Sequence, residues 1–328
     1  MKTNTKQKII DYIKQKGQAR PQDLTRDLEL YPTGLYRHLK KLTDDEVLLK
    51  VGTPPQVFYI LRSELKKVPP TQLNTQITEL IKNRYLYIDP KGRLLEGIEG
   101  FTQWVFNIKQ EKFYAQLAEE YVKFRQQADY FFHNQPWINA TKKFKQTFPD
   151  KTIDQVFYQD FYSLPKFGKT KLGQLVLHAK QAEHKKLIKQ IANLSEPVIE
   201  KLIKSLKIDA VAYIPHSLPR QIPFLREFNQ YLTLPLPEIK LVKAYAGEIP
   251  VAQKGLKKLE ERIENARETI YPQDMNIKFK HVLLIDDAVG SGSTFNEVAK
   301  KLKHQGVNKI SGFAIVGSLK GFSVIQEV

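Results

Sequence analysis

The stretch Val282 to Thr294 reads VLLIDDAVGSGST, and the order of its residues decides the fold. Val282 to Ile285 are apolar, which predicts the end of a parallel strand buried on both faces. Asp286 and Asp287 follow directly. Because open α/β sheets bind ligands beyond the carboxyl ends of their strands, we expect both carboxylates to face a ligand at this edge.

The residues after the aspartates form a small-residue loop ahead of a predicted helix. Gly290 to Thr294 predict a turn whose backbone amides converge on a phosphate, and the helix Phe295 to His304 adds its positive end. Carboxylates accept hydrogen bonds from sugar hydroxyls, whereas amides donate to phosphate. The predicted ribose 5-phosphate site comprises Asp286, Asp287, Ala288, Val289, Gly290, Ser291, Gly292, Ser293 and Thr294.

The competing interpretation of this stretch is an ordinary strand, turn and helix, with aspartate at the turn and glycine for tight geometry. A Walker phosphate loop is excluded because no Gly-Lys-Ser/Thr follows. A Rossmann fingerprint is excluded because the acids precede the glycines. The complete ordered string, rather than DD or GSG alone, favours the ribose 5-phosphate site.

Further motifs lie upstream of this stretch. Tyr213 to His216 close the apolar run AVAYIPH, and Arg220 follows. The later segments are REFNQ at Arg226 to Gln230, VAQKGL at Val251 to Leu256 and ERIENARETI at Glu261 to Ile270. Together with VLLIDDAVGSGST, these motifs resemble the ComF (competence-associated) branch of the type I phosphoribosyltransferases, over roughly Ile208 to Val328.

The resemblance implies a type I phosphoribosyltransferase fold, an α/β fold with a central, mostly parallel sheet flanked by helices. It implies that Asp286 and Asp287 grip the ribose hydroxyls of phosphoribosyl pyrophosphate (PRPP), while Ala288 to Thr294 grip its 5-phosphate. Arg220 and Arg226 are the candidate catalytic residues, because they could neutralise pyrophosphate oxygens. The arm from Lys243 to Arg267 would close over the site. The alternative is that the arginines are solvated and the arm is only an amphipathic helix.

Two departures from the family bear on its chemistry. Some members of the wider superfamily carry a carboxylate general base at the loop position that Gly290 fills here, and glycine cannot move a proton. Many ComF proteins have a cysteine zinc knuckle, whereas this chain contains no cysteine. Cysteine-ligated zinc and disulfides are therefore excluded, and the expected cofactor is Mg²⁺ bound through PRPP rather than by protein side chains.

The N-terminal residues 1–62 have a different pattern. Helices are predicted over Lys6 to Lys16, Pro21 to Leu28 and Pro32 to Leu42. Two strands, EVLLKV and QVFYIL, follow around the turn Gly52 to Pro55. This order resembles a small α+β winged helix-turn-helix DNA-binding domain, with LYRHLKKLTDDEVL as its recognition helix and the step into the wing.

The third predicted helix carries a basic face. We expect Arg37, His38, Lys40 and Lys41 to face the major groove or its phosphates, and Lys50 in the wing to reach the flanking backbone of double-stranded DNA. The alternative is a winged helix used for protein contacts, with these cations merely solvated.

The overall charge agrees with a polyanionic partner without selecting one. The 52 Lys+Arg and 35 Asp+Glu residues give a formal net charge of +17. Residues 1–62 hold twelve basic and seven acidic residues, a share of +5. The sequence has no apolar run long enough for a membrane span and no secretory signal core, so we expect a cytoplasmic protein.

The segment 63–151 is predicted to be a linker, a hairpin and a helical adaptor. ITELIKNR predicts a short helix, and YLYIDPKGRLL predicts two strands around the turn Asp89 to Gly92, which either extend the wing or form a separate adaptor. Phe101 to Asp129 predict one long amphipathic helix and a candidate surface for a homodimer. The phosphoribosyltransferase-like domain is predicted over 152–328.

Two function hypotheses of different classes remain. The first is a PRPP-responsive transcriptional regulator, because a winged helix fused to a PRPP-binding domain is similar in architecture to some bacterial purine operon repressors. The second is an active phosphoribosyltransferase that displaces pyrophosphate from PRPP with a nitrogen nucleophile. A DNA uptake or repair factor, as the ComF resemblance suggests, is the third and weakest alternative.

Overall fold

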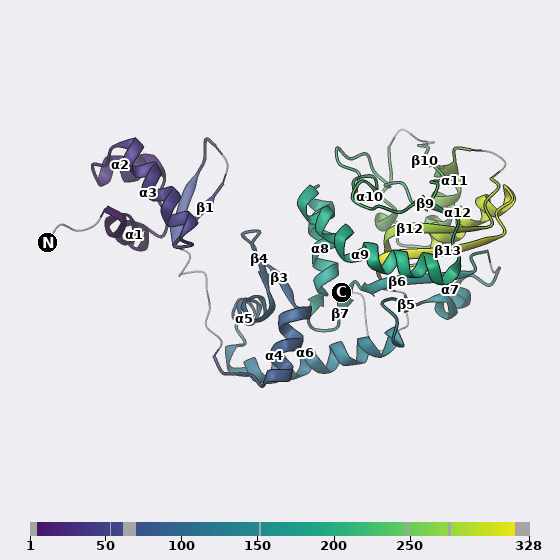
Figure 1. Ribbon diagram of the computed structural model, residues 1–328, viewed down its shortest axis with the longest axis horizontal. Coiled ribbons are helices and arrows are strands. Elements are labelled where there is room, and N and C mark those ends of the chain that lie inside the picture. Colours follow the sequence, from purple (N-terminus) through teal and green to yellow (C-terminus); the bar gives the residue numbers. More distant parts are fainter. Residues whose placement is uncertain are drawn as a thin grey trace. The chain divides into compact units, whose positions relative to one another are not determined.

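Figure 1 shows the computed structural model of the chain, which describes residues 5–52, 54–61, 70–150, 152–245, 247, 249–274 and 277–318. By its internal contacts the chain divides into two compact units. The first holds residues 1–72 with 102–114, and the second holds residues 73–101 with 115–328.

The N-terminal part of the first unit consists of three helices and a hairpin: α1 (Thr5–Lys16), α2 (Pro21–Asp27), α3 (Pro32–Asp44), β1 (Leu48–Val51) and β2 (Phe58–Leu61). Proline begins α2 and α3, where a missing N–H costs no helical hydrogen bond. Leu35, Leu39 and Leu42 recur at helical spacing and share one buried core with Ile9 and Ile13. These elements agree with the three predicted helices and two strands, whereas a DNA-binding role stays a prediction.

The predicted helix and hairpin of the next segment are present as α4 (Thr75–Arg84), β3 (Leu86–Ile88) and β4 (Leu94–Glu96). The Asp89 carboxylate accepts from the backbone N–H groups of Lys91 and Arg93 at 3.0 and 2.9 Å, which fixes the turn. β3 and β4 pair only with each other among the described strands. Of the two predicted alternatives, the structure therefore has a separate hairpin rather than an extension of β1 and β2.

The single long helix predicted over Phe101 to Asp129 is wrong. The chain instead forms α5 (Gly97–Asn107), the 3-10 helix η2 (Glu111–Phe113) and α6 (Tyr114–Asp129). Lys109 adopts a left-handed φ of 56°, and the Gln110 N–H donates to the Val105 carbonyl at 3.1 Å. The backbone thus closes α5 as a helix C-terminus, although neither Gly nor Pro marks this position in the sequence.

Part of the stripe predicted to pack a homodimer is buried inside the chain. Leu117 and Tyr121 are 4% and 3% exposed. The Tyr121 ring meets Tyr85 and Phe167 edge-on, with centroid distances of 5.1 and 5.3 Å. These residues therefore form core contacts, and the homodimer stays a prediction.

The centre of the second unit is a five-stranded sheet in the order β5 (Ile138–Asn139), β6 (Gln155–Phe161), β13 (Lys309–Gly317), β12 (His281–Val289) and β9 (Ala210–Tyr213). The last four of these strands are parallel, and β5 is antiparallel to β6. Val282 to Ile285 are fully buried, as a strand covered on both faces requires. The predicted α/β class with a mostly parallel central sheet is confirmed.

Helices and two short hairpins surround this sheet (Figure 1). The helices are α7 (Thr141–Thr147), α8 (Lys171–Gln181), α9 (Lys185–Leu206), α10 (Phe224–Asn229), α11 (Leu259–Thr269) and α12 (Ser293–His304). The hairpins are β7 (Ser163–Leu164) with β8 (Gly168–Lys169), and β10 (Leu241–Lys243) with β11 (Ile270–Pro272). α8 packs on β6 and β13, α12 also contacts β13, and α11 packs on α12. Within the described ranges, no helix has the length and apolar character needed to cross a bilayer.

Candidate functional site

Asp286 and Asp287 lie in the part of β12 that extends beyond the end of its neighbour β9. The strand does not end at Ile285 as predicted but runs to Val289, and Asp286 and Ala288 still pair with β13. Pairing with β9 stops at Ile285, opposite Tyr213. Beyond that point no described strand pairs with this side of β12, and the aspartates line a cavity there.

The acidic pair is held together and partly neutralised. The Asp287 N–H donates to Asp286 Oδ1 at 2.7 Å, and Lys180 of α8 forms an ion pair with Asp287 at 2.7 Å. Burial, followed by the neighbouring charge of Asp287, raises the pKa of Asp286 above its ordinary value. Burial alone would lower the pKa of Lys180, but the charge of Asp287 and the hydrogen bond to it produce a net rise. Lys180 therefore stays cationic beside the pair.

The loop from Gly290 to Thr294 turns the chain from β12 into α12. Gly292 has φ +81°, and a Cβ at this position would meet the Phe144 ring of α7 at 2.5 Å, so both the backbone conformation and the packing require glycine. The Ser291 and Ser293 hydroxyl oxygens lie 3.1 Å apart. The helix begins at Ser293, two residues earlier than predicted, which places the loop at its positive end.

The aspartates and the loop line one cavity of about 1000 Å³. All nine predicted ligand-binding residues, Asp286 to Thr294, are in its wall, together with Arg220, Arg226 and Lys180. Among the described residues that line it, the carboxylates are Asp286, Asp287 and Glu238. The volume is in the range of small-molecule sites, and the wall combines acidic, basic and hydroxyl groups.

The two candidate catalytic arginines have different environments. Arg220 Nη1 donates to the Lys180 carbonyl at 2.9 Å and lies 3.7 Å from Glu183, so the chain orients it. Arg226 is exposed, and no ion pair joins it to another described residue. Burial and then the charge of Arg220 lower the pKa of His216, which also lines the cavity. Arg226 is thus a cation on this wall that retains capacity for an anionic ligand.

Side chains of the predicted motifs form hydrogen bonds that hold the arm together. Gln253 Nε2 donates to the Arg262 carbonyl at 2.8 Å, and Arg262 Nε donates to the Leu256 carbonyl at 2.8 Å. Lys243 Nζ donates to Asn265 Oδ1 at 3.0 Å. These contacts give the Q-x-x-L and R-x-x-N motifs a structural role, because they connect β10, the following loop and α11.

The arm also contacts the loop Gly290 to Thr294. Gln253 Nε2 lies 3.3 Å from both Ser293 Oγ and Thr294 Oγ1. Arg267 of α11 pairs with the buried Glu297 of α12 at 3.1 Å. The arm is therefore closed against the loop and the helix that follows it. Burial and the nearby Lys301 lower the pKa of Lys243, a further cavity residue, to about 8.

Lys180 and Gln253 are site residues that the sequence alone did not single out. Lys180 is one of many lysines in a basic stretch, and only the packing of α8 against the sheet brings it to Asp287. Gln253 stands in the motif VAQKGL, which marked the arm, yet the motif did not reveal the contact with the loop hydroxyls. His184, in contrast, accepts from the Leu187 N–H as the N-cap of α9. Across the described residues, no three His, Cys, Asp or Glu gather as metal ligands.

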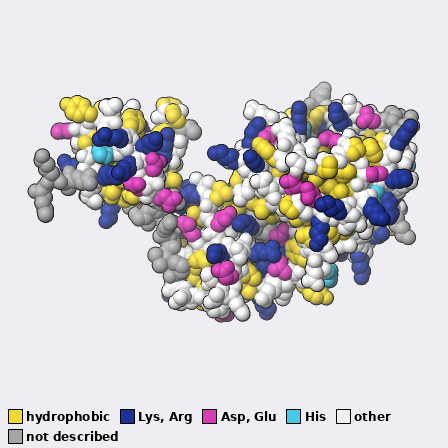
Figure 2. Space-filling model, viewed as in Figure 1, with side chains coloured by type: hydrophobic (Ala, Val, Ile, Leu, Met, Phe, Trp, Pro, Cys, Tyr) yellow, Lys and Arg dark blue, Asp and Glu magenta, His cyan; other side chains and the backbone are white. Residues whose placement is uncertain are grey.

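The predicted DNA-contacting residues share the α3 and β1 region of the first unit. Arg37, Lys40, Lys41 and Lys50 are exposed, and His38 is half-buried. Lys and Arg side chains gather on the face of the N-terminal part that Figure 2 displays. Tyr36, 56% exposed, adds an aromatic group to α3. The arrangement presents cations to solvent, and DNA contact itself stays a prediction.

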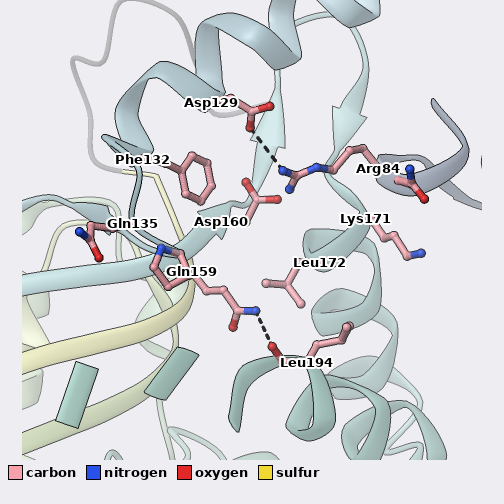
Figure 3. Close-up of a pocket in the computed structure, with 11 residues that line it drawn as sticks. Arg84, Asp129, Phe132, Gln135, Gln159, Asp160, Lys171, Leu172 and Leu194 are labelled. Carbon is pink, nitrogen blue, oxygen red and sulfur yellow. Dashed lines mark hydrogen bonds and ion pairs between the residues drawn. The ribbon is translucent and has the colours of Figure 1, made fainter. Parts of the chain in front are cut away.

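A second cavity, of about 540 Å³, lies between α4, α6, β6, α8 and α9 (Figure 3). Arg125, 2% exposed at its side chain, donates to both Asp160 oxygens at 3.1 and 3.0 Å and pairs with Asp129 at 2.7 Å. Arg84 lies 3.9 Å from Asp129, and Gln159 Nε2 donates to the Leu194 carbonyl at 3.0 Å. The charges around this cavity are therefore paired with one another.

No protein-family model and no curated protein matches the chain. Among solved structures, it is similar to a hypoxanthine-guanine phosphoribosyltransferase (hpt-2) from Bacillus anthracis, with 14% identity, a TM-score of 0.24, and coverage of 48% of this chain and 77% of that one. A purine phosphoribosyltransferase from Pyrococcus horikoshii gives 16% identity, a TM-score of 0.23, and coverage of 42% and 94%. A hypoxanthine phosphoribosyltransferase from Staphylococcus aureus has 16% identity and a TM-score of 0.22, and the match covers 43% of this chain and 68% of that one. At these values, the geometry of the site carries the functional argument.

Proposed function

We propose that this chain binds PRPP in the cavity around Asp286 and Asp287. The observation that carries the proposal is the meeting of the acidic pair, the loop Gly290 to Thr294 and two arginines in one wall. The carboxylates suit the ribose hydroxyls, and the loop amides with the positive end of α12 suit the 5-phosphate. Arg226, with Arg220 beside it, suits the pyrophosphate.

The chemistry of the site fits Mg²⁺ carried by PRPP. Carboxylate oxygens suit Mg²⁺, but Asp286 and Asp287 are assigned to the ribose hydroxyls, so the ion would be held mainly through PRPP. Lys180 already neutralises Asp287, so most of the ligands of the ion would come from PRPP oxygens and water. When bound, the ion would neutralise charge on the pyrophosphate, whereas the protein residues orient the ribose.

We further propose that the N-terminal helices bind double-stranded DNA, which makes the chain a PRPP-responsive transcriptional regulator. The exposed cations Arg37, Lys40 and Lys41 of α3 support this role. Phosphate contacts position such a helix on the duplex, and contacts to base edges select the sequence.

Calorimetry tests both parts of this proposal on the full chain. The protein is titrated with PRPP and Mg²⁺, with and without DNA fragments from its own upstream region. Binding of PRPP alone, and a changed DNA affinity when PRPP is present, are the expected results. Replacing Lys40 with Gln should reduce the dependence of DNA affinity on salt by about one unit in the log–log slope. A protein that shows no heat with PRPP, or no DNA binding at low salt, contradicts the corresponding part.

Active transfer is the second candidate function, and Glu238 favours it. Its Oε2 accepts from Asn229 Nδ2 at 2.8 Å, and it lines the same cavity as the aspartates. This carboxylate could receive a proton from a nitrogen nucleophile, the role that Gly290 cannot fill. Release of pyrophosphate from PRPP in the presence of nucleobases, abolished by Glu238→Gln, would select the enzyme. Binding of PRPP without any acceptor-dependent release would select the regulator.

A further inference from the structure

Gln253 has an amide orientation that its surroundings fix. Its Nε2 faces the Arg262 carbonyl at 2.8 Å, and a carbonyl oxygen can only accept. The nitrogen, rather than the oxygen, must therefore stand at this position. The same nitrogen lies 3.3 Å from Ser293 Oγ and from Thr294 Oγ1. One N–H of the amide is used by the Arg262 carbonyl, so the other is shared between the two hydroxyl oxygens, which accept it.

The direction of this hydrogen bond determines which atom donates in the next hydrogen bond along the loop. Ser293 is 2% exposed, and its Oγ lies 3.1 Å from Ser291 Oγ. The Gln253 nitrogen cannot accept, so Ser291 Oγ is the acceptor left for the proton of the buried Ser293 among the side-chain partners described for it. Ser291 Oγ also accepts from the Ser293 N–H at 3.4 Å. With its lone pairs used in this way, Ser291 is left with a proton to donate into the cavity.

We propose that Gln253 sets the direction of this hydroxyl chain, so that Ser291 and Thr294 donate to the phosphate of the ligand. Gln253 is thus a positioning residue that acts through the loop. The inference rests on the proposed function, because it assigns the phosphate to this loop. It also gives the closed arm a chemical role: closure orders the donors that an anion needs.

The test measures the affinity of the full-length protein for ribose 5-phosphate by calorimetry at pH 8. Gln253→Glu keeps the shape but places an acceptor opposite both hydroxyls, so their protons turn toward the arm and away from the cavity. Gln253→Met keeps the length and removes both polar atoms. We expect a loss of affinity of about tenfold or more for Glu and about threefold for Met.

Two controls separate this role from other causes. Gln273→Glu adds the same charge to the wall of the same cavity without a described side-chain contact to the loop, and should lose clearly less affinity than Gln253→Glu. Inorganic pyrophosphate should bind Gln253→Met as tightly as it binds the wild type. Lowering the pH from 8 to about 4, below the ordinary pKa of glutamate, should narrow the difference in affinity between Gln253→Glu and the wild type, because a protonated carboxyl can donate. Equal unfolding midpoints show that the arm stays folded.

The measured affinities either support or overturn the directed hydroxyl chain. A larger loss in Gln253→Glu than in Gln253→Met, narrowing at low pH, supports the directed hydroxyl chain. Equal losses of ribose 5-phosphate affinity in the two Gln253 variants, or an equal loss in Gln273→Glu, overturn the directed hydroxyl chain. The proposal that the cavity binds PRPP is not affected by these results. If the wild type binds PRPP but not ribose 5-phosphate or inorganic phosphate, the loop is not a phosphate site and the inference fails alone. If the wild type binds neither PRPP nor ribose 5-phosphate, the proposed function fails as well.

Discussion

The two cavities of the second unit differ in whether the charged side chains around them are paired within the chain. Around the smaller cavity, Arg125 joins Asp129 and Asp160, and Arg84 approaches Asp129, so each charge has a partner in the chain. Around the larger cavity, Asp286 is ionisable but has no cation of its own within ion-pair distance among the described residues, and Arg226 is similarly unpaired. Paired charges stabilise the packing of elements, whereas unpaired charges retain capacity for a ligand.

Removal of Arg125 should produce the largest effect on stability. Arg125→Met leaves the buried Asp160 without its partner and removes one of the two cations near Asp129, and we expect a loss of about 3 to 5 kcal/mol in the free energy of unfolding. Urea denaturation measures this loss. Arg125→Met combined with Asp160→Leu should recover much of it, because both buried charges of the pair are then removed. Wild-type stability of the single variant would show that the smaller cavity is not held by its ion pairs.

Removal of the acidic pair should lower PRPP affinity in a chain that still folds. Asp286→Asn with Asp287→Asn keeps the side-chain shapes, and each charged hydrogen bond lost should cost about 1 to 3 kcal/mol of PRPP affinity. Calorimetry with PRPP and Mg²⁺ measures this change, and circular dichroism monitors the fold. Unchanged affinity in the double variant would remove the larger cavity from consideration as the PRPP site.

The pH dependence of stability should differ between the wild type and Asp286→Asn. Burial and Asp287 raise the pKa of Asp286 in the folded state, so the folded protein holds this proton at pH values where the unfolded chain releases it. The contribution of Asp286 to stability is therefore favourable below its unfolded pKa and declines as the pH rises toward its folded pKa. Thermal denaturation without ligand, between pH 4 and 8, should show a gain of Asp286→Asn over the wild type that grows with pH. A constant difference contradicts the raised pKa.

Arg226→Ala should give the smallest change in stability. The side chain is exposed and has no described ion pair, so the free energy of unfolding should change by about 0.5 kcal/mol or less. The affinity for inorganic pyrophosphate should nevertheless fall several-fold, because a charge-assisted hydrogen bond is lost. Arg220→Ala is the matched comparison, since it also removes the contact with the Lys180 carbonyl and should lower stability as well. Equal pyrophosphate binding by Arg226→Ala and the wild type would argue against the assignment.

Local patterns of the sequence predicted the elements that form the main site. The apolar run, the aspartates and the glycine loop are consecutive, so one strand, turn and helix carry them all. The strand length was missed because β12 remains paired with β13 after β9 has ended, and that depends on a neighbouring strand. The break at Lys109 was missed because a left-handed lysine has no distinctive sequence signal.

Contacts between distant segments were not predictable from patterns. The spacing of Arg125 and Asp129 on α6 is visible in the sequence, but Asp160 lies on β6 and joins them only through packing. Lys180 meets Asp287, and Gln253 meets Ser293, for the same reason. The sequence therefore identified the loop that lines the larger cavity, whereas the contacts of Lys180 and Gln253 with this region come from the fold.

The contact between Gly292 and Phe144 has a consequence for dissecting this protein into fragments. Phe144 belongs to α7, which precedes residue 152, the predicted start of the phosphoribosyltransferase-like domain. A fragment that begins there would lack both the aromatic backing of the loop and β5, the edge partner of β6. Expression trials should consequently place the cut upstream of α6, so that the fragment keeps α7 beneath the loop, β5 beside β6, and the Arg125 that pairs with the buried Asp160.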